Sequence, residues 1–168
     1  MRIIISGAGI GGLTAALCCL QHGHSVTVLE RAERLDALGA GIQLPPNAMC
    51  VFQALGLGGL FDGLAFQPEA LEARMGRSGR YLFSAPLNEA TRQRWPAPYL
   101  HIHRADYISA LRQALDNKAP TALRLGAEIT AYRQDEKAVT VKLADGSALE
   151  GDVLIGADGI HSTIQEQM

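Results

Sequence analysis

The chain has 168 residues, 48% of them hydrophobic, and a formal net charge of -2 at pH 7. Its length supports one domain with a hydrophobic core, and its apolar content excludes a disordered chain. No basic stripe of the kind that binds nucleic acid or an anionic membrane is present, so we expect neither partner. Cys18, Cys19 and Cys50 lack the spacing of a metal site or a disulfide framework. We therefore expect reduced thiols, no bound metal and a cytoplasmic protein.

The apolar segment that runs up to Leu20 has some features of a signal peptide or a membrane span. It is interrupted by four glycines, Gly7, Gly9, Gly11 and Gly12, and no clear small-residue cleavage site follows it. We therefore interpret this segment as folded structure.

The first thirty residues have the pattern of a βαβ unit. A β-branched run bounded by glycine predicts a buried strand over Arg2–Ser6. A helix follows, whose apolar positions recur at spacings of three and four: Ile10, Leu13, Leu17 and Leu20. Gly23 is expected to end this helix. The next strand is predicted over Ser25–Glu30 and carries a carboxylate at its end.

The glycines between strand and helix match the Gly-x-Gly-x-x-Gly pattern of dinucleotide sites. Gly7 permits the tight turn, Gly9 leaves room for a pyrophosphate, and Gly12 lets the helix pack close to the strand. Free N–H groups and the positive helix end then face the phosphates.

Glu30 lies 18 residues after the last of these glycines, where an acid accepts hydrogen bonds from ribose hydroxyls. Its charge would repel a 2′-phosphate, which argues against NADP here. The pattern alone leaves NAD and FAD open. The alternative is an ordinary glycine-rich turn with Glu30 as a surface charge.

The remaining pattern predicts an α/β fold with a parallel sheet and antiparallel hairpins. Helices are expected from Pro45, from the residues after Arg104, and at Ser162, which has the character of a helix cap. The predicted extended segments and strands are 39–44, 69–86 as a hairpin, 99–103, 123–125, 129–134, 137–143 and a buried strand at 153–155. Asp145-Gly146 predicts a hairpin turn.

Four segments in this order resemble the FAD-binding monooxygenases, the single-component flavin aromatic hydroxylases. They are GAGIGGLTAALCCLQHGHSVTVLER from Gly7, GAGIQLPPN from Gly39, HRAD from His103, and DVLIGADGIHS from Asp152. The pattern is most similar to the salicylate and 6-hydroxynicotinate hydroxylase branch. The resemblance implies a Rossmann-like FAD-binding domain over 1–168, with 60–100 contributing to a substrate-side sheet.

The resemblance also implies the chemistry of the parent protein. NADH or NADPH would reduce FAD, and one oxygen atom of O2 would be transferred to a small aromatic acid. A homodimer is compatible with this family. The cofactor-binding positions that it implies are Gly7, Gly9, Ile10, Gly11, Gly12, Glu30, Arg31, Gly41, Gln43, Arg104, Ile129 and Asp158.

Two of these positions have an alternative reading. Arg104 matches an arginine that contacts the FAD backbone in relatives, and a guanidinium suits phosphate or ribitol recognition. The alternative is an exposed arginine at a helix start, although the helix dipole disfavours a cation there. Asp158 matches a residue linked to FAD and NAD(P)H. The alternative is an Asx turn after a strand.

Gln43 departs from some relatives, which carry a histidine that acts as a base beside the substrate. An amide cannot take up a proton near pH 7, so either the base lies elsewhere or none is needed. A polar contact to the flavin is the alternative, and the catalytic residue stays unknown. Gln165 stands where relatives often carry arginine, which puts a nicotinamide-phosphate contact there in doubt. For His101 and His103 we expect solvated or structural roles.

Family members are more than twice this length, and their second FAD motif would lie beyond residue 168. The sequence therefore predicts an N-terminal fragment of a flavin hydroxylase. Two alternatives stay open: a nucleotide-binding fragment without turnover, and an NAD-dependent Rossmann dehydrogenase.

Overall fold

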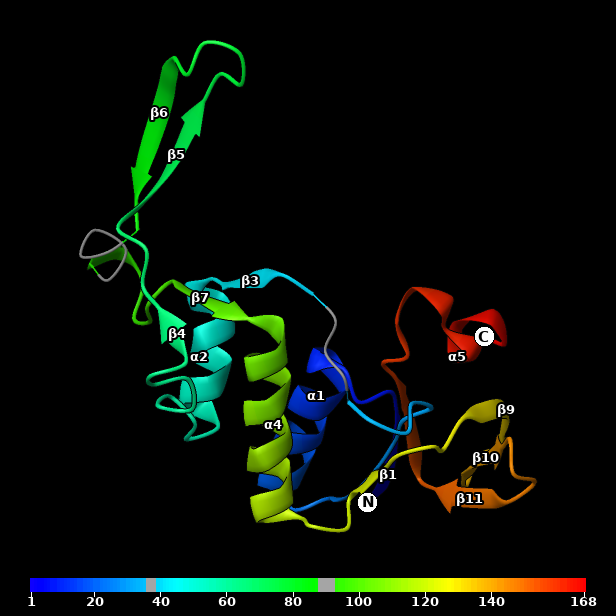
Figure 1. The fold of residues 1–168 in the computed structure, drawn as a ribbon. Coiled ribbons are helices and arrows are strands. Elements are labelled where there is room, and N and C mark those ends of the chain that lie inside the picture. The colour runs from blue at the N-terminus through cyan, green and yellow to red at the C-terminus, as the bar shows by residue number, and fades with distance from the viewer. Residues whose placement is uncertain (36–38, 88–92) are drawn as a thin grey trace. The chain divides into compact units, whose positions relative to one another are not determined.

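The computed structural model describes residues 1–35, 39–87 and 93–168 (Figure 1). The chain divides into two units. Unit 1 consists of residues 1–37 and 108–168, and unit 2 of residues 38–107. The boundary between them falls within the helix α4 (Arg104–Lys118).

A four-stranded parallel sheet is the centre of unit 1. Its order is β12 (Val153–Gly156), β1 (Arg2–Ser6), β2 (Ser25–Leu29) and β8 (Leu123–Arg124). Helix α1 (Ile10–Gln21) connects β1 to β2 and contacts both strands. The predicted βαβ unit is therefore confirmed, and Gly23 follows α1 with a φ of +75°.

Strand β12 differs from its prediction in burial. The sequence predicts a buried strand at 153–155, but these residues are only half-buried. The reason is position, because β12 lies at the edge of the sheet and, among the described strands, pairs with β1 alone.

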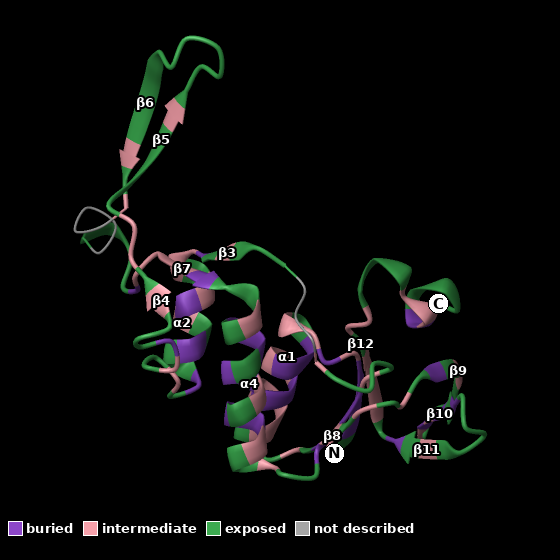
Figure 2. Cartoon of the chain, in the orientation of Figure 1, coloured by how far each residue is buried: buried purple, intermediate pink, exposed green. Residues whose placement is uncertain are grey.

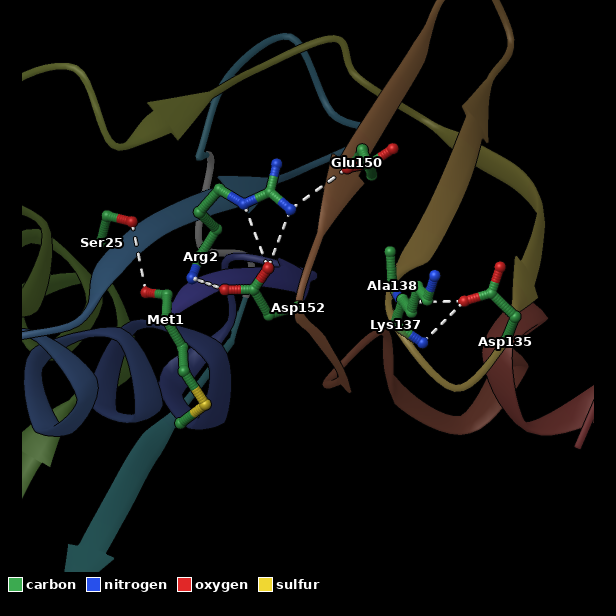
Figure 3. A network of polar contacts seen from close by, with 8 residues as sticks. All are labelled: Met1, Arg2, Ser25, Asp135, Lys137, Ala138, Glu150 and Asp152. Carbon is green, nitrogen blue, oxygen red and sulfur yellow. Dashed lines mark hydrogen bonds and ion pairs between the residues drawn. The ribbon is translucent and has the colours of Figure 1, made fainter.

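The second sheet of unit 1 is antiparallel, in the order β11 (Ala148–Gly151), β10 (Val139–Leu143) and β9 (Ile129–Gln134). The predicted turn at Asp145-Gly146 joins β10 to β11 and is confirmed. The predicted strand 137–143 begins only at Val139. The Asp135 carboxylate accepts the N–H groups of Lys137 and Ala138, at 2.8 and 3.0 Å, and so shapes a turn there (Figure 3).

One hydrophobic cluster joins the two sheets of unit 1 to α5 (Thr163–Glu166), which follows a short 3-10 turn over Gly159–His161. Its buried members are Ile4, Leu29, Ile129, Val141, Leu143 and Ile164. Figure 2 shows buried segments on β1 and on the strands of the antiparallel sheet. Apolar burial across both layers is the main stabilising contribution to unit 1.

Arg2 links the start of β1 to the turn between β11 and β12 (Figure 3). Its backbone N–H and its guanidinium donate to the Asp152 carboxylate, at 2.7 and 2.8 Å, and the guanidinium also reaches Glu150 at 3.2 Å. The backbone bond first, and then the side-chain bond, hold the pKa of Asp152 below its usual range.

Unit 2 contains an antiparallel sheet of three short strands, in the order β3 (Gly41–Leu44), β7 (Leu100–His103) and β4 (Ala65–Phe66). Helix α2 (Pro46–Ala54) follows β3 with proline at its start, as predicted. The rings of Phe52, Phe61 and Tyr107 pack edge to face, with centroids 5.0 to 5.9 Å apart. This burial raises the pKa of Tyr107 to about 12.

The predicted hairpin over 69–86 is confirmed as β5 (Ala70–Arg74) paired with β6 (Tyr81–Pro86). Its strands are largely exposed (Figure 2), and the exposed side chains include Leu71, Leu82 and Phe83. Of the range 60–100 assigned to a substrate-side sheet, residues 88–92 lie outside the described residues.

Candidate cofactor-binding site

The turn between β1 and α1 brings backbone atoms together so closely that it excludes side chains. Gly7 has a φ of +98°, and its N–H donates to the Leu29 carbonyl at 2.7 Å. A Cβ at Gly12 would overlap the carbonyl oxygen of Gly7. The roles predicted for these two glycines, a tight turn and close helix–strand packing, match this geometry.

The N-terminus of α1 is open. Its first intrahelical bond runs from the Leu13 N–H to the Gly9 carbonyl at 3.0 Å, so the N–H groups of Ile10, Gly11 and Gly12 precede the bonded ladder. No side chain of the described residues caps this end, and no acidic residue lies in the first turn. A Cβ at Gly9 or Gly11 would meet nothing within 4 Å. Free N–H groups and the helix dipole therefore face space that an anion can enter.

Glu30 comes directly after β2 and is held by the backbone on both sides. One carboxylate oxygen accepts the Ala8 N–H at 2.8 Å and the other accepts the Ala32 N–H at 2.9 Å. These bonds orient the carboxylate, and each oxygen keeps a lone pair for a further donor. Two ribose hydroxyls are donors of the required kind.

One pocket of unit 1 brings several predicted residues together. Gly7, Glu30, Arg31, Ile129 and Asp158 all line it. Six other residues line it, and none was predicted as a site residue: Ser6, Leu29, Ala127, Glu128, His161 and Thr163. His161 lies in the segment DVLIGADGIHS, which could have pointed to it, whereas only the tertiary fold brings Glu128 beside Glu30.

Asp158 is engaged inside its own loop. Its carboxylate accepts the Ser162 hydroxyl at 2.6 Å and the Ile164 N–H at 3.2 Å. Ser162 in turn accepts the Gln165 N–H at 3.0 Å, so its predicted role as a helix cap is confirmed. Asp158 therefore organises the turn into α5 while it also lines the pocket, and its bonds reach four and six residues ahead rather than the two of an Asx turn.

The other predicted residues lie in unit 2. Arg104 is the first residue of α4; its side chain lies against Gly39, and its N–H donates to the Ala40 carbonyl at 3.4 Å. Gly41 and Gln43 lie on β3 and line a groove of about 320 Å³. The histidines of β7, predicted to have solvated or structural roles, line the same groove.

Two other kinds of feature bear on function. Within residues 1–35, 39–87 and 93–168, no helix combines the length and the apolar character needed to cross a membrane. The same residues contain no group of three or more histidine, cysteine, aspartate or glutamate side chains placed to hold a metal ion.

Over residues 1–168 the chain matches the protein family described as FAD binding domain. It belongs to this family. The FAD-binding domain is 39% identical over 167 residues to 3-hydroxybenzoate 6-hydroxylase from Polaromonas naphthalenivorans (strain CJ2). It is 33% identical over 167 residues to 6-hydroxynicotinate 3-monooxygenase from Pseudomonas fluorescens. Both alignments cover 99% of this chain, but only 42% and 43% of the relatives.

A solved structure agrees with the same assignment. The FAD-binding domain superimposes on HpxO from Klebsiella pneumoniae complexed with FAD and uric acid, with a TM-score of 0.83 and 31% identity. The match covers 98% of this chain and 41% of that one. The predicted fold class and the resemblance to flavin aromatic hydroxylases are thus confirmed, and the chain spans less than half of the relatives' length.

Proposed function

We propose that this domain is the FAD-binding portion of a flavin-dependent monooxygenase that uses NADH or NADPH and O2 to hydroxylate an aromatic acid. The observation that carries the proposal is the open N-terminus of α1 beside the oriented carboxylate of Glu30. Together they suit the pyrophosphate and the ribose of a dinucleotide. The names of the relatives, which are aromatic hydroxylases and monooxygenases, support the reaction class.

Within unit 1, the proposal assigns the ADP half of FAD to the pocket at Glu30. The N–H groups of Ile10, Gly11 and Gly12 would bind the pyrophosphate, and Gly9 would leave room for it. Glu30 would accept the ribose hydroxyls. Its charge disfavours the 2′-phosphate of NADP in the same pocket.

The lining residues complete this assignment. Arg31 would add a cation near the phosphates, and Ile129 an apolar contact. Asp158 lines the same pocket, and its bonds to Ser162 and Ile164 would hold its loop in shape around FAD.

Within unit 2, Gly41, Gln43 and Arg104 would contact the rest of FAD. In the part of the chain that the structure describes, Arg104 forms no ion pair, so its guanidinium remains available to a phosphate or ribitol. FAD supplies the redox chemistry with NAD(P)H and O2. Gln43 can orient a ligand by hydrogen bonds but cannot serve as a base.

The proposal also covers the substrate-side sheet, the cellular location and the oligomeric state. Residues 60–100 would contribute to a substrate-side sheet, and the exposed apolar side chains of the β5–β6 hairpin support this because an isolated hairpin is marginally stable. The free thiols of Cys18, Cys19 and Cys50 agree with a cytoplasmic location. A homodimer is part of the same proposal, and sedimentation equilibrium tests it.

A second candidate follows from the length of the chain. Because the alignments cover only 42% of the relatives, the 168 residues alone would bind FAD without turnover. The purified chain should then show flavin absorption that is released on denaturation, yet oxidise no NADH when 3-hydroxybenzoate is added. A longer protein that contains this chain should oxidise NADH in the presence of an aromatic acid.

The rival ligand is NAD, which an NAD-dependent dehydrogenase would bind through the same fold. Thermal unfolding separates the two: FAD should raise the melting temperature of the chain more than NAD at equal concentration. A larger shift with NAD, together with a colourless purified protein, would contradict the proposal.

A further inference from the structure

The groove of unit 2 lies on one face of the β3–β7–β4 sheet. Its walls combine exposed apolar side chains with polar groups, namely Leu64, Phe66, Gln43 and His101. Phe66 is 62% exposed, and its ring forms an apolar surface suited to contact with another ring. Among the described residues that line the groove, none is acidic.

Tyr99 determines which hydrogen-bonding group Gln43 presents. The Tyr99 hydroxyl lies 2.6 Å from Oε1 of Gln43, and since an amide oxygen carries no hydrogen, the phenol donates. This bond uses one lone pair of the amide oxygen and fixes which way the amide faces. Among the described residues the Nε2 group of Gln43 forms no hydrogen bond, so it can donate to a ligand.

His101 lies beside Gln43, since the two residues are cross-strand partners on β7 and β3. Its ring contacts the rings of Phe66 and Tyr99, with centroid distances of 5.2 and 5.7 Å. Within the described part of the chain, neither ring nitrogen of His101 forms a hydrogen bond. The two aromatic neighbours thus hold the ring in place while its N–H stays free to donate.

We infer that Tyr99 makes Gln43 a hydrogen-bond donor into this groove, and that Gln43 and His101 together bind an acceptor oxygen of a planar aromatic ligand. A carboxylate or a phenolate is the ligand group that two donors without an acidic neighbour select. Phe66 and Leu64 contact the ring. That this ligand is the substrate of hydroxylation rests on the proposed function, whereas the donor character of the groove does not.

The test measures benzoate and benzyl alcohol binding to the 168-residue chain by ligand-observed NMR titration. Benzoate should bind more tightly, because only its oxygens are anionic acceptors. Gln43→Glu keeps an acceptor for Tyr99 but replaces the free N–H group with a negative oxygen, so benzoate affinity should fall about tenfold or more. Gln113→Glu is the matched control, an exposed glutamine on α4 with the same change of charge, and it should bind like the wild type.

Two further variants keep the inference testable if Gln43→Glu does not fold. Tyr99→Phe frees the amide to turn, so the preference for benzoate over benzyl alcohol should shrink. His101→Phe keeps the ring packing but removes the donor, so benzoate should bind more weakly. Equal affinities for the two ligands in the wild type, or benzoate binding that these variants leave unchanged, would overturn the inference.

FAD binding by the wild-type chain is measured separately. Loss of FAD binding with intact benzoate selectivity would refute the proposed function alone. FAD binding without benzoate selectivity would refute the donor groove alone.

Discussion

Gly11 and Gly12 are adjacent in α1, yet replacement of each by alanine should change stability in opposite directions. Alanine improves helix propensity by about 0.5–1 kcal/mol at either position. At Gly11 the new methyl group meets nothing within 4 Å, so this gain should appear as increased stability. At Gly12 it would overlap the Gly7 carbonyl oxygen and lie 3.5 Å from the Ala157 methyl.

The overlap at Gly12 cannot be relieved by a side-chain rotation, because the obstructing atom belongs to the backbone. Gly7 is itself held by its 2.7 Å bond to Leu29. Overpacking of this kind costs about 1–3 kcal/mol, and a backbone clash belongs at the upper end. The propensity gain is common to both variants and cancels, so the two should differ by about 3 kcal/mol.

Urea denaturation followed by far-UV circular dichroism gives the free energy of unfolding of both variants. Gly11→Ala should unfold at a higher urea concentration than the wild type, and Gly12→Ala at a lower one, with similar m-values. Equal stabilities of the two variants would refute the close helix–strand packing.

Gly9→Ala should leave the free energy of unfolding within about 0.5 kcal/mol of the wild type, since a Cβ there meets no described atom within 4 Å. The same variant should lower FAD affinity about tenfold or more in calorimetric titrations, because the methyl group would occupy the space for the pyrophosphate. The bonds from Arg2 hold the pKa of Asp152 in the folded protein below its unfolded value of about 3.9. These bonds therefore stabilise the fold above about pH 3.9, and this stabilisation is lost as the pH falls through the folded pKa. Asp152→Asn should therefore lower the urea midpoint at neutral pH, and this difference from the wild type should shrink as the pH falls below about 3.9. Tyr107, with a pKa raised by burial to about 12 against about 10 unfolded, should cause stability to fall as pH rises between these values, and Tyr107→Phe should reduce that loss.

The local parts of the fold follow from sequence because their causes are local. A β-branched run, helical spacing of leucines and a terminal glycine predict β1 and α1 within one residue of their observed ends. The strand β4 (Ala65–Phe66) was not predicted, since two residues carry no period. The early start predicted for β10 fails because Asp135 binds the two N–H groups ahead of Val139, a side-chain bond that hydrophobic alternation does not reveal.

The candidate site, too, could be predicted only where its residues lie close together in the sequence. Gly7, Gly12 and Glu30 belong to one βαβ unit, so their arrangement could be predicted from spacing. The bond from Tyr99 to Gln43 joins residues 56 positions apart and depends on the register of β3 against β7. That register is set by tertiary structure, so the pairing of His101 with Gln43 could not be predicted from spacing.

The central claim is that the N-terminus of α1 and Glu30 hold the ADP half of FAD. Its most direct test is a titration of FAD into the wild-type chain and into Glu30→Gln, with ADP as competitor and the exposed Glu136→Gln as control. We predict that FAD binds the wild type and the control equally, that ADP displaces it, and that Glu30→Gln weakens binding about tenfold or more, because the amide replaces one accepting oxygen with a donor. FAD binding that is unaffected by both ADP and Glu30→Gln, or no FAD binding to a folded wild-type chain, would contradict the claim.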